Sequence, residues 1–279
     1  MNTTSSSIPF TCDLTVNPIF EISKYFGTVF YLGIGGYLHF SIIRITLGKR
    51  KKQFGEGSFF KLFATDSVAS LFLIISDLLF NRFFMYISPL CPIIGPYFYE
   101  PSVIMKVFYQ VSHHFRFAKS IAQIFMVLNR MSCVLMPMGY GQIWKSLTPI
   151  CIVLVFLLPW GGTWNVLISR TFGVPVYGGF ATNYIRAVPW AALSLFQSIY
   201  ILTALFFTVI CTSITLFKLI SIPDRIKSAE KSLCLASFGI SITFLLVAGT
   251  QMCFASTTCR VWNGLYVAQL LAFDTFTVG

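Results

Sequence analysis

The chain alternates between long apolar stretches and short polar connections, a pattern typical of helices that cross a lipid bilayer several times. A helix needs about 20 residues to span the hydrocarbon core, and several stretches reach or exceed that length. The predicted spans are 25–45, 58–80, 109–137, 147–168, 188–220, 232–255 and 261–279. The predicted fold is therefore an all-α membrane protein, in which residues 25–279 form a bundle of seven transmembrane helices.

The third span differs from the others because it combines an apolar pattern with polar side chains. Lys119 and Gln123 lie near its start, and Asn129 and Arg130 end an apolar run. A charge within a membrane span is costly and usually faces the interior of a bundle or a water-filled cavity. We therefore expect this helix inside the bundle, with its first part near a ligand and its last part near a cytoplasmic partner.

Composition supports the membrane interpretation and narrows the set of partners. Hydrophobic residues make up 56% of the chain and charged residues only 10%, whereas soluble domains carry about 25% charged residues. The formal net charge is +11. In a membrane protein such basic residues set the orientation and contact anionic lipid. The lipid bilayer is thus an expected partner, and nucleic acid is not.

Basic residues also predict which side of the bilayer each end faces. Lys and Arg are roughly twice as frequent beside the first, third and fifth connections as beside the others, which places those connections in the cytoplasm. The basic run 48–52 is either a cytoplasmic stop signal or a lipid or effector contact. Residues 1–24 then form an extracellular segment, and Asn2 begins an Asn-Thr-Thr sequon that is a glycosylation candidate.

Three of the eight cysteines, Cys12, Cys91 and Cys259, fall in segments predicted to lie outside, where disulfides persist. We expect one disulfide among them, with Cys91 as a member and its partner left open. The other cysteines fall within or at the end of apolar runs and are interpreted as small core residues. The sequence contains no C-x-x-C pair and predicts no metal site.

Charged residues in the second and third spans are the candidates for a ligand pocket. Asp66 and Asp77 are about three helical turns apart and share a face; they bind a cation or pair with a base of a neighbouring helix. His113, Arg116 and Lys119 share a basic face, which neutralises Asp77 or receives an acidic ligand. The pocket candidates are Asp77, His113, Arg116, Lys119 and Gln123, and Asp66 is a buried polar candidate.

Two connections and the end of the chain complete the prediction. Residues 81–109 contain Pro89, Pro92, Pro96 and Pro101 and are expected to be non-helical. Residues 169–187 are expected to form an outer loop. The last span, 261–279, barely crosses a bilayer, so a truncated C-terminus is expected.

Catalytic motifs are missing from the sequence. We find no glycine-rich phosphate loop, no H-E-x-x-H motif and no G-x-S-x-G elbow, and no nucleophile–base pair stands out. The two halves show no internal repeat, which weakens an inverted-repeat transporter. The prediction is that the chain is not an enzyme and uses no cofactor.

Several segments carry a resemblance to a known family. They are 59–92, which contains LCP, then EPSVIMK at 100–106, then 113–144, which contains AKS and NRM-x-C, and the closing FDTFTVG. With these segments the chain resembles the nematode serpentine receptor class gamma family, and the resemblance extends over nearly the whole chain. The resemblance implies a G protein-coupled chemosensory receptor, with a small-molecule ligand and a heterotrimeric G protein as partners. It also implies a multi-pass protein of the plasma or ciliary membrane of chemosensory neurons.

The resemblance assigns roles by analogy, with departures. Asn129-Arg130-Met131 occupies the place of the Asp/Glu-Arg-Tyr motif of rhodopsin-like receptors, so Asn129 and Arg130, with Lys227 in the third inner loop, are G protein contact candidates. Asn129 carries no carboxylate, so it cannot form an ion pair with Arg130. The loop after the fourth span also lacks the cysteine that rhodopsin-like receptors use for their disulfide. The alternatives are a ligand-gated channel or transporter that uses the buried charges, and a truncated or chaperone-like membrane protein that does not signal.

Overall fold

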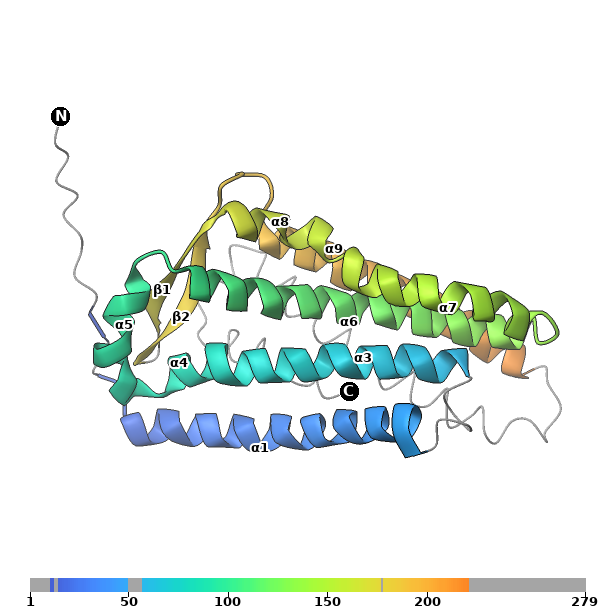
Figure 1. The fold of residues 1–279 in the computed structure, drawn as a ribbon, viewed down its shortest axis with the longest axis horizontal. Helices are drawn as coiled ribbons and strands as arrows, with labels where there is room; N and C mark the ends of the chain where they lie inside the picture. Colours follow the sequence, from blue (N-terminus) through green and yellow to red (C-terminus); the bar gives the residue numbers. More distant parts are fainter. Residues whose placement is uncertain (1–10, 13–14, 50–56, 177, 221–279) are drawn as a thin grey trace.

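The computed structural model describes residues 11–12, 15–49, 57–176 and 178–220. The predicted spans 232–255 and 261–279, together with Asn2, Lys227 and Cys259, lie outside these residues. Within the described part, five long helical segments run along a common direction, and a two-stranded hairpin lies at one end (Figure 1).

The first segment consists of α1 (Pro18–Ile43), which continues into the short π-helix η1 (Arg44–Lys49). It begins before the predicted start at residue 25 because Asn17 caps it: the Oδ1 of Asn17 accepts a hydrogen bond of 3.0 Å from the backbone N–H of Ile19. Pro18 occupies the first turn, where its missing N–H costs nothing. Residues 18–24, which were predicted to belong to the N-terminal segment, are thus part of this helix.

The second segment runs without interruption from residue 58 to residue 86 as α3 (Ser58–Ser76), η2 (Asp77–Arg82) and α4 (Phe83–Tyr86). A single turn of 3-10 helix, η3 (Ser88–Leu90), leads into α5 (Cys91–Tyr99). The prediction that residues 81–109 are non-helical was therefore wrong. Pro92 lies in the first turn of α5, where proline is tolerated, and Pro96 lies inside this short helix.

The third segment, α6 (Val103–Leu135), is the centre of the described bundle. It packs against α3 on one side and against the fourth and fifth segments on the other, as Figure 1 shows. With 33 residues, it is about 50 Å long, which exceeds the thickness of a bilayer with its headgroups. Its buried face carries polar side chains along nearly its whole length.

The fourth segment is broken into two helices. α7 (Tyr140–Leu157) and α8 (Trp160–Ile168) meet at Pro159. At the break, the carbonyl of Leu158 accepts hydrogen bonds from the backbone N–H of Gly161 at 3.0 Å and from the hydroxyl of Tyr200 at 2.8 Å. Tyr200 belongs to the fifth segment, α9 (Leu193–Ile220), so the break is stabilised by a neighbouring helix.

The predicted outer loop 169–187 is a β-hairpin. β1 (Arg170–Val176) pairs antiparallel with β2 (Gly179–Ile185), in a register that runs from Arg170 opposite Ile185 to Val176 opposite Gly179. Gly178 has a φ of 78°, a backbone conformation that glycine adopts without strain. The strands escaped prediction because their glycine, proline and polar residues suggest a loop.

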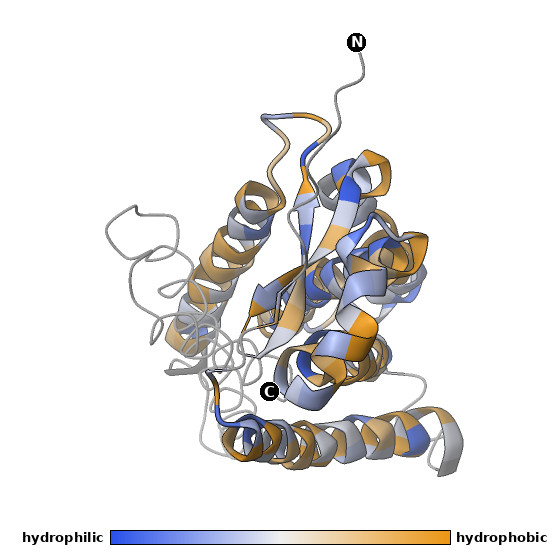
Figure 2. Cartoon of the chain, turned by 90° about the vertical axis from the view of Figure 1, so that its left-hand side faces the viewer, coloured by the Kyte–Doolittle hydropathy of each residue, from blue (hydrophilic) through white to orange (hydrophobic). Residues whose placement is uncertain are grey.

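Four of the described helical segments are long and apolar enough to cross a membrane: Pro18–Gly48, Ser58–Tyr86, Tyr140–Ile168 and Leu193–Lys218. α6 falls outside this set because its polar residues lower its hydropathy, and those residues face the protein interior. Large apolar side chains such as Phe26, Phe30 and Phe206 are exposed on the outside of the helices, where lipid would cover them. Figure 2 shows the apolar colour continuing along the outer helices.

The hairpin end contains β1, β2 and α5, and lies at the left of Figure 1. The turn end contains the turn at residues 136–139 between α6 and α7, and lies at the right.

Candidate functional site

The polar groups with the strongest mutual interactions lie between α3–η2 and α6, near the hairpin end. Asp77 is buried, and its two carboxylate oxygens accept bonds from Arg82 Nε at 2.9 Å and from Arg116 Nη2 at 3.1 Å. The side-chain amide of Asn81 donates to the same carboxylate at 2.8 Å. Because a buried carboxylate must be paired, this contact fixes α6 against the second segment.

Local backbone geometry explains why Arg82 reaches Asp77. The two residues are the first and last residues of the π-helix η2, in which the repeating hydrogen bond joins residues five apart. The wider turn places residue 82 above residue 77, where an α-helix would rotate it away. Sequence reasoning missed Arg82, and its separation of five residues from a buried acid was the only available signal.

The next polar contact along α6 is between Lys119 and the middle of α3. Lys119 is buried, its Nζ donates to Ser70 Oγ at 2.8 Å, and it lies 3.7 Å from Asp66 Oδ2. The other carboxylate oxygen of Asp66 is buried and has no hydrogen-bond partner among the described residues. Of the two roles predicted for the acids of the second span, pairing with neighbouring bases is the one that the structure shows.

His113 and Gln110 extend the polar face of α6 toward the hairpin. The ring of His113 is buried and lies edge-on against Tyr109, with 4.5 Å between ring centroids, and its Nδ1 has no hydrogen-bond partner. Gln110 donates to Thr163 of α8 at 2.6 Å. Gln123, a further ligand candidate, is buried one turn beyond Lys119. The five predicted pocket residues therefore lie within one polar stretch of the bundle interior.

The Asn129–Arg130 pair forms a different contact at the turn end. Asn129 is only 1% exposed, and its Oδ1 accepts a hydrogen bond of 3.0 Å from the hydroxyl of Tyr140 at the start of α7. Ser132 donates to the backbone carbonyl of Asn129 at 2.9 Å and accepts from Trp144 Nε1 at 2.6 Å. Asn129 thus holds the turn, and in this conformation it is not accessible to a partner.

Arg130 is oriented by an aromatic ring. Its guanidinium carbon lies 4.5 Å from the ring centroid of Phe59 in the first turn of α3, a cation–π contact. Phe59 in turn stacks on Phe63, with 5.9 Å between centroids. Arg130 is only partly buried, so it remains near the surface of the turn end. Neither Tyr140 nor Phe59 was a sequence candidate, because nothing in the sequence indicates which aromatic residue lies beside the pair.

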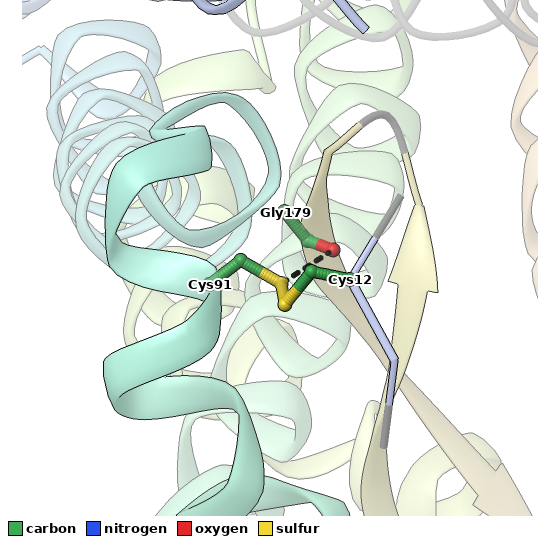
Figure 3. Close-up of a disulfide and its surroundings, with 3 residues drawn as sticks. All are labelled: Cys12, Cys91 and Gly179. Atoms are coloured by element: carbon green, nitrogen blue, oxygen red, sulfur yellow. Dashed lines mark hydrogen bonds between the residues drawn. A yellow bond between two sulfur atoms is a disulfide. The ribbon is translucent and has the colours of Figure 1, made fainter. Parts of the chain in front are cut away.

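A disulfide lies at the hairpin end. Cys12 and Cys91 are bonded with 6.1 Å between their Cα atoms, which joins the segment before α1 to the first residue of α5. The Sγ of Cys91 lies 3.7 Å from the carbonyl oxygen of Gly179, the first residue of β2. Figure 3 shows the disulfide between α5 and the tip of the hairpin. Cys259, the third candidate, lies outside the described residues.

The described residues contain no group of three or more His, Cys, Asp or Glu side chains placed to hold a metal ion. What they contain is a multi-helix membrane protein whose central helix has a polar face buried against two neighbours. Polar side chains lie inside the bundle, and large apolar side chains lie on its outside. This distribution is typical of polytopic membrane proteins, whose chain crosses the bilayer several times.

Comparison with known proteins identifies the family. Residues 25–279 of the chain match the family described as Srg family chemoreceptor. It is 54% identical over 273 residues to serpentine receptor class gamma-15 of Caenorhabditis elegans, covering 97% of this chain and 85% of that protein. Over 268 residues it is 50% identical to serpentine receptor class gamma-17 of the same organism, covering 96% of this chain and 84% of that protein. The chain belongs to the Srg family of serpentine chemoreceptors.

Family membership confirms the resemblance seen in the sequence. The chain is a multi-pass, serpentine chemoreceptor-like membrane receptor, and its relatives are receptors from a family not known as enzymes. The family also implies a bundle of seven helices, of which the described residues include five long segments.

Proposed function

We propose that this chain is a chemosensory receptor that binds a small molecule at the hairpin end and activates a heterotrimeric G protein at the turn end. The observation that carries the proposal is the polar face of α6, which runs from Arg116 through Lys119 to Asn129 and contacts another helix at each of these points. A single helix therefore links both ends of the protein.

The distribution of charge supports the assignment of the two ends. At the turn end, the exposed bases include Arg44, Lys61, Lys145 and Lys218. The described acids of the hairpin end include Glu21, paired with Lys24 at 2.6 Å, and Asp77. An excess of positive charge favours the cytoplasmic side, so the turn end faces the cytoplasm and the G protein.

The proposed mechanism is a shift between two arrangements of α6 relative to α3. A ligand near Asp77, His113 and Arg116 changes the contacts that fix α6 at the hairpin end. It favours one arrangement only by as much as it binds that arrangement more tightly. At the turn end the same displacement changes the position of Arg130 over Phe59. Asn129 acts in this scheme by holding the turn, and Arg130, with Lys227, contacts the G protein.

The experiment is G protein activation in cells that express the chain with a G protein reporter and are exposed to a library of volatile and water-soluble small molecules. Arg130→Ala should reduce any response roughly tenfold or more without loss of surface expression. The matched control is Lys145→Ala, which removes an exposed base from the same end and should leave the response unchanged. An unchanged response in Arg130→Ala would show that Arg130 does not contribute to G protein activation.

The channel or transporter alternative makes a different prediction. Its ion path would use Asp66 and Asp77, and both carboxylates lie beside basic groups in the structure. A ligand-induced current that persists after the G protein is inactivated would favour it over the receptor proposal. The plasma or ciliary membrane of chemosensory neurons is the proposed location, which imaging of the tagged protein in the animal would test.

A further inference from the structure

Two buried polar atoms near the start of α6 have no hydrogen-bond partner among the described residues. They are Oε1 of Gln110 and Nδ1 of His113. The two side chains are only 4% and 8% exposed, and they lie three positions apart on the same side of the helix. Buried polar groups are almost always hydrogen-bonded, so two exceptions within one helical turn mark a place that suits a bound molecule.

The hydrogen bonds of Thr163 in α8 fix the orientation of the Gln110 amide. Thr163 donates its hydroxyl proton to the carbonyl of Pro159 at 3.0 Å, and a hydroxyl has only one proton to donate. Its Oγ1 therefore accepts from Gln110, and the atom of Gln110 that faces it, at 2.6 Å, is the donor Nε2. The remaining Oε1 is an acceptor, which requires a hydrogen-bond donor.

The charged groups beside this pair of atoms are already matched with one another. Asp77 accepts from both Arg82 and Arg116, so two guanidinium groups share one carboxylate and leave an excess of positive charge. Arg116 lies one turn beyond His113 on α6, and this excess opposes a cationic ligand. The partial negative charge on Oε1 of Gln110 opposes an anionic one. A neutral donor remains as the group that fits.

Aromatic rings lie beside the two polar atoms. The ring centroid of Tyr109 is 4.5 Å from that of His113 and 5.8 Å from that of Tyr184 in β2. Tyr109 and Tyr184 are only partly buried, and both pack against a buried apolar cluster that includes Phe117. Small-molecule sites in proteins typically combine aromatic walls with a few polar groups that fix the orientation of the ligand.

We propose that Gln110 and His113 hold the polar group of the ligand, and that the ligand is a neutral small molecule with a hydroxyl group on an apolar body. The hydroxyl donates to Oε1 of Gln110, and the imidazole of His113 binds the same end of the molecule. The apolar body lies against Tyr109 and Tyr184. The proposal rests on the function proposed above, whose ligand site it narrows to one chemical class.

The experiment measures binding of matched small molecules to the purified full-length chain in detergent at neutral pH. The probes are primary alcohols with straight-chain or phenylalkyl bodies, each compared with its methyl ether, amine and carboxylate. Binding is followed by the rise in melting temperature with probe concentration. At least one alcohol should bind about tenfold more tightly than its ether, as expected for one buried hydrogen bond. The ether is less polar than the alcohol, so partition into the micelle does not produce this preference.

Gln110→Met removes the acceptor and keeps a side chain of similar length. It should abolish the preference for the alcohol over the ether, whereas a purely structural defect weakens the binding of both. The matched control is Thr215→Val, which removes a buried hydroxyl from the other end of α9 and should keep the preference. If Gln110→Met does not fold, His113→Phe applies the same test to the second polar group.

Two results overturn the proposal. In the first, no alcohol binds the unchanged chain more tightly than its ether, as expected if internal water satisfies both atoms. In the second, the preference survives in Gln110→Met or, where that variant does not fold, in His113→Phe. Because the measurement involves no G protein, either result leaves receptor signalling itself open to its own test. A chain that prefers the alcohol and activates no G protein would support this inference and contradict the proposed function.

Discussion

Arg116 on α6 donates a hydrogen bond of 3.1 Å to the carboxylate of Asp77. The two residues are 39 positions apart in the sequence, so the contact joins two separate helical segments. The same carboxylate bonds to Arg82 of its own segment. Asp77 is thus the one described acid shared by two guanidinium groups, and the arrangement of α6 against the second segment depends on it.

Asp77→Asn should be strongly destabilising. The change leaves two guanidinium groups beside a neutral amide, and breaking a buried ion pair by removing one partner costs roughly 3–5 kcal/mol. Thermal unfolding of the purified protein in detergent would measure the loss. The control is Glu100→Gln, which removes an exposed acid from the same end and should change the melting temperature little. Equal stability of the two variants would contradict the central role of Asp77.

Lys119→Met should destabilise the middle of the bundle because it leaves Asp66 buried without its ammonium partner. A second change, Asp66→Asn, removes the uncompensated charge and should restore part of the lost stability. A double-mutant cycle on the melting curves therefore should give a coupling of about 1 kcal/mol or more. Strictly additive effects would show that the distance of 3.7 Å between Lys119 and Asp66 carries no energetic interaction.

Two adjacent glycines in α8 offer a test of packing against α6 and α9. A Cβ on Gly162 would lie 2.7 Å from the ring of Phe117 and 2.9 Å from that of Tyr200, whereas one on Gly161 would meet no atom closer than 3.9 Å. Gly162→Ala should therefore cost about 1–3 kcal/mol through overpacking. Gly161→Ala should be neutral or slightly stabilising. Melting temperatures in the opposite order would be inconsistent with this helix contact.

Tyr140→Phe tests the hydrogen bond that holds the turn. The variant removes the hydroxyl that donates to Asn129 at 3.0 Å and should cost about 1 kcal/mol. Hydrogen exchange around residues 136–140 should rise in parallel, because the start of α7 loses its link to α6. Tyr37→Phe on the exposed face of α1 is the matched control. Unchanged hydrogen exchange at the turn would show that the hydrogen bonds of Ser132 with Asn129 and Trp144 hold the turn without the hydroxyl of Tyr140.

Within the described residues, each of the first five predicted spans overlaps a long helical segment, because the length of an apolar stretch follows from the thickness of the bilayer. The sequence does not predict the hairpin, because its close approach at Gly179 to the carbonyls of Phe84 and Met85 depends on a distant segment of the chain. It does not predict α5 either, because Pro92 and Pro96 ordinarily argue against a helix.

The candidate site was predicted in part. The residues Asp77, Arg116 and Lys119 were identified because charge in an apolar stretch is conspicuous. Their pairing was left open, since a sequence does not show which helix faces which. Arg82 and Ser70 were missed for the same reason: each becomes significant only through a partner positioned by the fold.

The amide of Asn129 has one further consequence. A carboxylate in its place would carry a negative charge at neutral pH and would gain a proton only below about pH 4. An amide carries no such charge, so its bond with Tyr140 is unaffected by moderate acidification. The contact between Asn129 and Tyr140 therefore depends on how α6 and α7 are positioned and not on an acid at position 129.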